Sequence, residues 1–166
     1  IACDCSSDVG SSDLGGLQSH RPLNWKIIAA GKPALAFARL GIEEYLGRLG
    51  AITKVETHFV KTGTGLHDRM LALSEGCHRI LLDERGKQFT SRTFAAGIQK
   101  LENQSISRCA LLVGASDGWD EPMRSRANLL WALGTLTLQH ELALVVALEQ
   151  IYRAHMILAG APYHRD

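Results

Sequence analysis

A glycine-rich turn, Gly114-Ala115-Ser116-Asp117-Gly118, follows the most apolar segment of the chain, Cys109 to Val113. Glycine permits positive φ and a close approach of the backbone to a ligand, so such a turn after a buried strand resembles a nucleotide-binding turn. The spacing is not GxGxxG, and no acidic residue ends a strand about 20 positions later, as the dinucleotide fingerprint requires. The turn is a candidate ligand loop, with a purely structural turn as the alternative.

Metal and nucleophile chemistry can be tested against the residues around His140-Glu141. A zinc protease helix would need a second histidine at position 144, where Leu144 stands, so a metal site is rejected. No serine occupies a nucleophile elbow, which rejects triad chemistry. His140 differs from the other histidines because it begins a long helix beside an expected ligand loop; a structural role is the alternative.

The last helix, expected from Gln139 to Ala159, is apolar on nearly all sides. A surface helix carries a narrower apolar stripe, so this helix is either central or buried by a partner subunit. Glu149, Gln150 and Arg153 are embedded in it and require polar partners. They predict either a core ion pair or the seam of a dimeric active site.

The elements that must position these residues alternate between strand and helix patterns. Strands are expected at 25–30, 55–59, 79–83, 109–113 and 133–138, with a polar turn at 84–88. Helices are expected at 35–49, around 70–73, after a Ser91 cap, after an Asp120 cap and at 139–159. This order predicts an α/β fold with a mainly parallel sheet and helices on both faces. Ligands then bind beyond the carboxyl ends of the strands, near the loops after Asp83, Val113 and Leu138.

The composition fits one domain with a tail: 166 residues, 46% hydrophobic, and 18 basic against 17 acidic residues for a net charge of +1. That balance lacks the basic excess of a strong nucleic-acid binder, and no apolar run approaches the roughly 20 residues of a membrane span. The four cysteines fit neither a zinc ribbon nor a disulfide framework, and no signal peptide is visible. Residues 1–24 are expected to be a disordered or non-native extension, and 25–166 the folded domain.

The segment from Thr135 to Asp166 resembles the carboxyl terminus of the ribosomal RNA large subunit methyltransferase H family, of the SPOUT class. The resemblance rests on Glu149 with Tyr152-Arg153-Ala154 and on Pro162-Tyr163-His164. Upstream, GIEEYLGRL (41–49), LLDERGKQFTS (81–91) and LLVGASDG (111–118) are similar to family segments in the family's order. The match spans about residues 25–166.

This resemblance implies a SPOUT domain with a trefoil knot near its carboxyl end. It also implies a homodimer that binds S-adenosyl-L-methionine in the knot without any metal. Leucines suit such a pocket, because they wall an adenine while main-chain groups read its edge. The cofactor-binding positions carried over by motif are Leu82, Gly114, Leu133, Gly134, Thr135, Leu136, Thr137 and Leu138.

The activity implied is methylation of N3 of a pseudouridine in 23S rRNA on the assembled ribosome, in the cytoplasm. Such a reaction needs alignment of donor and acceptor and loss of the N3 proton. His140 is the candidate base or orienting group, and Arg153, Tyr163 and His164 are the candidate RNA-positioning groups. Local phosphate contacts are expected from Arg85, Lys87, Arg124, Arg126 and Arg165.

Three departures from the family pattern keep alternatives open. Gln139 replaces the usual proline, which makes the corner before the last helix less rigid, and the segment from Lys61 to Gly76 is shorter than usual. Leu144 stands where family members commonly carry arginine. If that arginine contacts RNA or the reacting base, either Arg153 takes over its role or the chain is a cofactor-binding ribosome-association factor with weak or lost catalysis. A SPOUT enzyme acting on tRNA is a further alternative.

Overall fold

The computed structural model describes residues 22–164, which form a five-stranded sheet and five helices. In chain order the elements are β1 (Asn24–Ala30), α1 (Ala36–Gly50), β2 (Val55–Val60), α2 (Leu66–Leu73), β3 (His78–Gln88), α3 (Ser91–Asn103), β4 (Arg108–Val113), α4 (Glu121–Arg124), β5 (Leu129–Ala132) and α5 (His140–Leu158). The strand order is β2-β1-β4-β3-β5, and every pair is parallel. The predicted α/β class and parallel sheet are confirmed.

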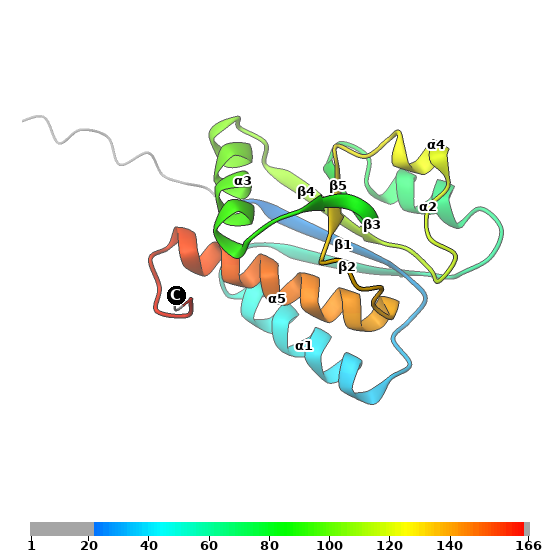
Figure 1. Cartoon of the computed structure of the whole chain (residues 1–166), viewed down its shortest axis with the longest axis horizontal. Helices are drawn as coiled ribbons and strands as arrows, with labels where there is room; N and C mark the ends of the chain where they lie inside the picture. Colours follow the sequence, from blue (N-terminus) through cyan, green and yellow to red (C-terminus); the bar gives the residue numbers. More distant parts are fainter. Residues whose placement is uncertain (1–21, 165–166) are drawn as a thin grey trace, which may run out of the picture.

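Two helical layers sandwich the sheet (Figure 1). Ile27 of β1 packs in one apolar cluster with α1, α3 and α5, whereas its neighbour Ile28 packs in a second cluster with Met70 of α2 and Met123 of α4. Successive side chains of a strand point to opposite faces, so one buried strand supplies both clusters. The expectation of helices on both faces is confirmed.

The folded domain begins before Trp25. Leu23 is fully buried, its amide donates to Glu102 and its carbonyl accepts the Thr53 hydroxyl at 2.6 Å. Leu23 and Asn24 therefore belong to the domain and not to the amino-terminal extension in which the sequence placed them. Residues 1–21, on which the rest of that expectation falls, and Arg165 lie outside the described residues.

Two expected strand boundaries are wrong. The polar segment 84–88 is not a turn but the continuation of β3, which pairs with β5 again at Lys87 after a register shift. Its polar side chains are tolerated because only β5 lies beside this part of β3 and most of them face solvent. The fifth strand is Leu129–Ala132, whereas 133–138 forms a loop. Its alternating Leu and Thr residues imitate strand periodicity without a partner strand, and Leu136 is 80% exposed.

Helix caps explain where the helices begin. Asp120 caps α4 as expected, accepting the Met123 amide at 2.8 Å with Pro122 in the first turn. The cap of α3 is Thr90, not Ser91, because Thr90 and Thr93 form a reciprocal capping box. Ser91 instead donates to Gln150 of α5. Among residues 22–164, none of the helices combines the length and apolar character needed to cross a bilayer.

One buried hydrogen bond links β1 to α5: the Trp25 indole donates to His155 Nε2 at 3.0 Å. An imidazole that accepts this bond is neutral, and burial lowers the pKa of His155 to about 4. In the unfolded chain the pKa returns to about 6.5, so the unfolded state binds the proton more tightly.

We therefore expect the contribution of His155 to stability to be complete above a pH of about 6.5 and to be lost as the pH falls towards 4. The pKa shift corresponds to about 3 kcal/mol of unfolding free energy. Urea unfolding followed at a series of pH values across this window measures the slope. The His155→Gln variant keeps a hydrogen-bond acceptor but does not titrate, so its pH dependence should be flatter; equal slopes would contradict the assignment.

Candidate functional site

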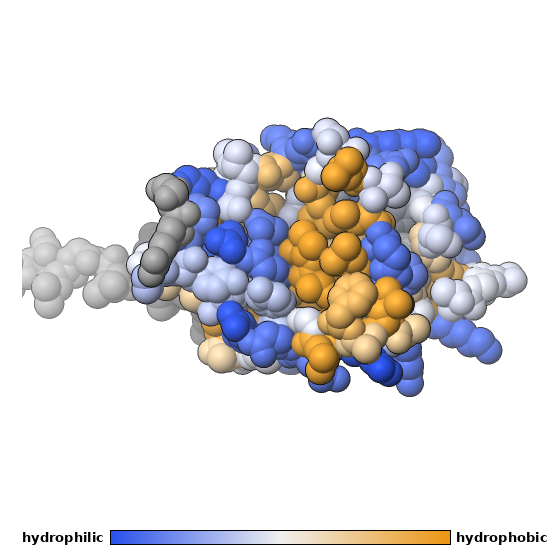
Figure 2. Space-filling view, turned by 60° about the horizontal axis from the view of Figure 1, so that its bottom comes forward, coloured by the Kyte–Doolittle hydropathy of each residue, from blue (hydrophilic) through white to orange (hydrophobic). Residues whose placement is uncertain are grey.

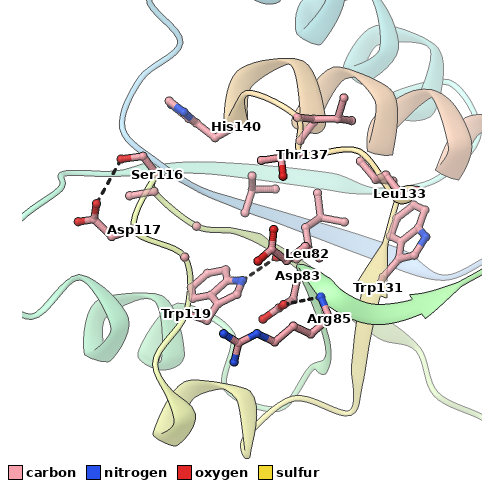
Figure 3. Close-up of a pocket in the computed structure, with 18 of the residues that line it drawn as sticks. Leu82, Asp83, Arg85, Ser116, Asp117, Trp119, Trp131, Leu133, Thr137 and His140 are labelled. Carbon is pink, nitrogen blue, oxygen red and sulfur yellow. Dashed lines mark hydrogen bonds between the residues drawn. The ribbon is translucent and has the colours of Figure 1, made fainter.

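A cavity of about 290 Å³ opens beyond the carboxyl ends of β3, β4 and β5. Three segments far apart in the chain line it: the end of β3 and the residues after it, the glycine turn with Trp119, and the loop between β5 and α5 (Figure 3). This is the edge at which parallel sheets bind ligands. Its volume is at the lower end of the range for small-molecule sites.

The structure brings together nearly all of the residues expected to bind the cofactor. The lining includes Leu82, Gly114, Leu133, Gly134, Leu136, Thr137 and Leu138. Thr135 is exposed and is not part of the lining. The positions carried over by motif from three separate segments therefore lie around one cavity.

The main-chain amides of the loop 133–138, most of whose residues line the cavity, lack main-chain partners within residues 22–164. Among the described residues, the amides of 134–138 make no hydrogen bond to another main-chain group, in contrast to the ladder of β5 and the turns of α5. Backbone donors and acceptors without partners are costly unless solvent or a ligand satisfies them. Leucine side chains beside free amides can enclose a flat heterocycle and hydrogen-bond to its edge.

Trp119 lines the site and is not among the residues that the sequence identifies. Its indole Nε1 donates to the Leu82 carbonyl oxygen at 2.7 Å (Figure 3), and a Cβ added at Gly114 would lie 3.1 Å from its ring. The side chain is buried although it directly follows the exposed glycine turn. A tryptophan immediately after a turn was the only sequence signal that could have identified it.

A buried ion pair lies at one wall of the cavity. The Asp83 carboxylate accepts the Arg124 Nε–H at 2.6 Å and the Arg85 amide at 2.8 Å. Burial raises the pKa of Asp83, but these two donors outweigh it and hold the pKa below its ordinary value. The Nε of Arg124 is engaged by Asp83, and Arg85 is exposed; the phosphate contacts expected of both arginines stay a prediction.

His140 lies at the first position of α5 and lines the cavity, across from Asp83 and Arg85 in Figure 3. Gln139, which replaces the family proline, caps the helix: its Oε1 accepts the amides of Glu141 and Leu142 at 2.8 and 3.0 Å. This fixes the amide so that Nε2, a donor, faces His140 Nδ1 at 3.4 Å. The lone pair of a neutral His140 therefore sits on Nδ1, with the proton on Nε2, 4.0 Å from the Glu141 carboxylate.

Hydrogen bonds to Glu141 connect the start of α5 to the loop after β1. Its buried carboxylate accepts the amides of Ala34 and Leu35 at 3.0 and 2.9 Å. Burial raises the pKa of Glu141, but the two amides outweigh that effect and keep the pKa below its ordinary value. The carboxylate is therefore held as an anion beside His140.

The other three expected catalytic residues gather elsewhere, at the carboxyl-terminal end of α5. Arg153 donates from Nε and Nη2 to one oxygen of Glu149, and the Tyr163 hydroxyl donates to the same oxygen at 3.2 Å. His164 Nδ1 lies 3.3 Å from Arg153 Nη1. Arg153 lies thirteen positions after His140 along the helix, a rise of about 20 Å. Within one chain these groups do not form a single site with the cavity.

Leu144 faces the core. Its side chain is 2% exposed and packs in the cluster between α5, α1 and the sheet. Position 144 therefore contributes packing, and it offers no surface to RNA. Cys77 and Cys109 are buried free thiols, as expected, and no group of three potential metal ligands occurs in the described part of the chain.

Comparison with known proteins agrees with this geometry. The family model "Predicted SPOUT methyltransferase" matches residues 23–164. The protein named ribosomal RNA large subunit methyltransferase H of Thermus thermophilus is 41% identical over 140 residues, covering 84% of this chain and 97% of the relative. Proteins of the same name from Deinococcus radiodurans and Geobacter metallireducens are 40% and 36% identical, covering 84% and 85% of this chain and 97% and 98% of each relative.

A solved structure, that of a probable methylase family protein from Haemophilus influenzae, has the same fold with a TM-score of 0.53. It is 10% identical and covers 87% of this chain and 71% of that chain. Three observations agree. The parallel sheet has a cavity beyond β3, β4 and β5, the family model matches nearly the whole described domain, and the relatives have a similar length. This chain belongs to the SPOUT methyltransferase family.

Proposed function

We propose that this chain is an S-adenosyl-L-methionine-dependent methyltransferase that modifies N3 of a pseudouridine in 23S rRNA, on the assembled ribosome in the cytoplasm. The observation that carries the proposal is the cavity between the Gly114 turn and the loop 133–138. The relatives named for large-subunit rRNA support the substrate class. A nearly neutral protein suits a composite ribosomal surface, which does not demand an extended basic stripe.

The residues around the cavity fit S-adenosyl-L-methionine. The leucines of 133–138 and Leu82 supply apolar walls, and the unpaired amides of the loop supply donors for an adenine edge. Gly114 allows the chain to approach without a side chain in the way. When bound, the cofactor supplies an electrophilic methyl group on a sulfonium.

The remaining chemistry falls to the chain's own residues. N3 of a pseudouridine carries an imide proton that must leave as the methyl group arrives. His140 lines the cavity and would accept that proton at Nδ1, where the substrate would have to replace the 3.4 Å contact with the Gln139 amide. Arg153 would stabilise the negative charge that develops on the ring, and Glu149 holds its guanidinium in one orientation. Alignment of the two reactants contributes about 7–11 kcal/mol in well-oriented systems.

A homodimer would join the two ends of α5 into one site. Figure 2 shows apolar side chains gathered in a band on the face formed by α1 and α5. Phe37 and Leu40 of α1 are 55% and 68% exposed. Leu142 and Val146 of α5 are only half-buried. Such a band on a chain of this size favours a self-complementary interface, in which Arg153 of one subunit reaches the cavity of the other.

We also propose that α5 closes a trefoil knot. The loop 133–138 lines one cavity together with segments from the ends of β3 and β4, and α5 then packs against both α1 and α3. Knots, in which one end of the chain passes through a loop formed by other segments, are rare in proteins. The family's fold supports this reading, in which the knot holds the cofactor loop in place.

We expect labelled S-adenosyl-L-methionine to transfer its methyl group to ribosomes that lack the modification. Purified protein is incubated in parallel with such ribosomes, with free 23S rRNA and with tRNA, and the labelled nucleotide is identified after digestion. Label at N3 of a pseudouridine in ribosomes supports the proposal. Label confined to tRNA would assign the chain to the tRNA alternative, and cofactor binding without transfer to the association-factor alternative.

Neither alternative has an observation of its own. The association factor rested on Leu144 replacing an RNA-contacting arginine, but the Leu144 side chain lies in the core. No residue of the described chain favours tRNA over ribosomes.

A further inference from the structure

Trp119 joins the two strand ends that border the cavity. Its indole N–H is bonded to the Leu82 carbonyl oxygen at 2.7 Å, at the end of β3. The benzene half of the same ring lies under the glycine turn that follows β4, where a Cβ on Gly114 would be 3.1 Å from Cε2 and 3.2 Å from Cζ2. One side chain therefore contacts two of the main-chain positions assigned to the cofactor.

The ring has little freedom to move. The Trp119 side chain is 5% exposed and packs in the apolar cluster with Leu112 and Met123. His67 of α2 stands behind it, with ring centroids 5.4 Å apart, and is itself held by Asp120 at 3.0 Å. A shift of the ring by a few tenths of an ångström would lengthen the bond to Leu82 or displace that carbonyl.

We propose, on the basis of the proposed function, that Trp119 is a positioning residue for the cofactor. Its hydrogen bond to the Leu82 carbonyl oxygen and its packing against Gly114 set the spacing between the ends of β3 and β4. Gly114 and Trp119 form a matched pair, because the indole fills the space that a side chain at 114 would need. Trp119 acts through Leu82 and Gly114, so we expect its loss to change cofactor affinity and not the chemical step.

Trp119→Phe keeps an aromatic ring and removes the donor. We expect its dissociation constant for S-adenosyl-L-methionine, measured by calorimetry on the full-length protein, to rise about tenfold. The KM for the cofactor should rise in parallel, whereas kcat at saturating cofactor should stay within about twofold of wild type.

Trp25→Phe is the matched control. Trp25 is also a buried tryptophan with one indole hydrogen bond, to His155, but it lies at the opposite end of β1 from the cavity. Both variants should lose stability to a similar degree, and only Trp119→Phe should lose cofactor affinity. A purely structural role for Trp119 would leave the dissociation constants of the two variants equal.

A double-mutant comparison tests the matched pair. Gly114→Ala in the wild-type background should weaken cofactor binding by about tenfold or more, because the indole cannot retreat. In the Trp119→Leu background the same alanine should cost less than about threefold, since the shorter side chain leaves room. The inference would be overturned if Gly114→Ala weakened cofactor binding equally in both backgrounds, or if Trp119→Phe bound the cofactor as wild type does. Either result would leave the proposed function standing. Absence of binding by wild type would remove the proposed function together with it.

Discussion

Mixing equal amounts of His140→Ala and Arg153→Ala subunits should restore about a quarter of wild-type methyl transfer, although each variant alone is nearly inactive. The two residues lie at opposite ends of α5, about 20 Å apart, so a site that uses both must combine two subunits. Half of the randomly mixed dimers are heterodimers, and each of these carries one site with both residues intact. Activity is measured after mixing under conditions that allow subunits to exchange.

Each variant alone should lose about 100-fold or more in turnover, as is usual when a proton acceptor or a charge-stabilising group is removed. His140→Ala should bind the cofactor almost normally, because main-chain groups and leucines form most of the lining. The control for subunit exchange mixes wild type with subunits that carry both His140→Ala and Arg153→Ala. Failure to recover activity in exchanged dimers would place both groups in the same subunit's site or outside the mechanism, and unchanged turnover of either variant would remove that residue from it.

Replacing Gly86 by alanine should lower the free energy of unfolding by about 3 kcal/mol. A Cβ there would lie 2.5 Å from the Leu130 carbonyl carbon and 2.6 Å from the Trp131 amide nitrogen, both of them backbone atoms of β5. β3 and β5 would have to separate at the register shift. Because β5 leads directly into the loop 133–138, cofactor binding should also weaken by at least about tenfold. Urea unfolding and calorimetry measure the two effects.

Gly97→Ala is the matched control for this prediction. Gly97 lies exposed in the middle of α3, and an added Cβ meets no atom within 4 Å. Alanine there should raise the free energy of unfolding by about 0.5–1 kcal/mol, since a helical glycine loses more chain entropy on folding. The same substitution thus has opposite signs at the two positions. If Gly86→Ala lowered the free energy of unfolding by less than about 1 kcal/mol, β5 would be able to move aside for the added Cβ, and the prediction would be wrong.

Elements with a complete local signal were predictable. Periodicity and cap residues predict the alternating strands and helices, the Asp120 cap and the long last helix. The segments 84–88 and 133–138 were misassigned because local pattern was the only guide. Whether a polar segment extends a strand depends on the neighbour that pairs with it, and a Leu/Thr alternation needs a partner strand to become one.

The candidate site divides in the same way. The glycine turn and His140 could be identified from the sequence, because the residue type and its immediate neighbours were enough to suggest a role in the site. Trp119 and the Asp83–Arg124 pair were not, since their roles arise from contacts across 37 and 41 residues of chain. The position of Leu144 likewise depended on which side of α5 the sheet covers, and periodicity on a helix apolar all round does not specify that side.

What the amino-acid sequence determined by itself is the α/β class, the order of elements and, through family motifs, the residues around the cavity. Only the tertiary structure decided that the cavity walls meet through the indole of Trp119, and that Arg153 lies a helix-length away from His140. The physical reason is range: propensity, capping and periodicity act over a few residues. Spacing between strand ends and the distance between two polar clusters are set by packing between segments far apart in the chain.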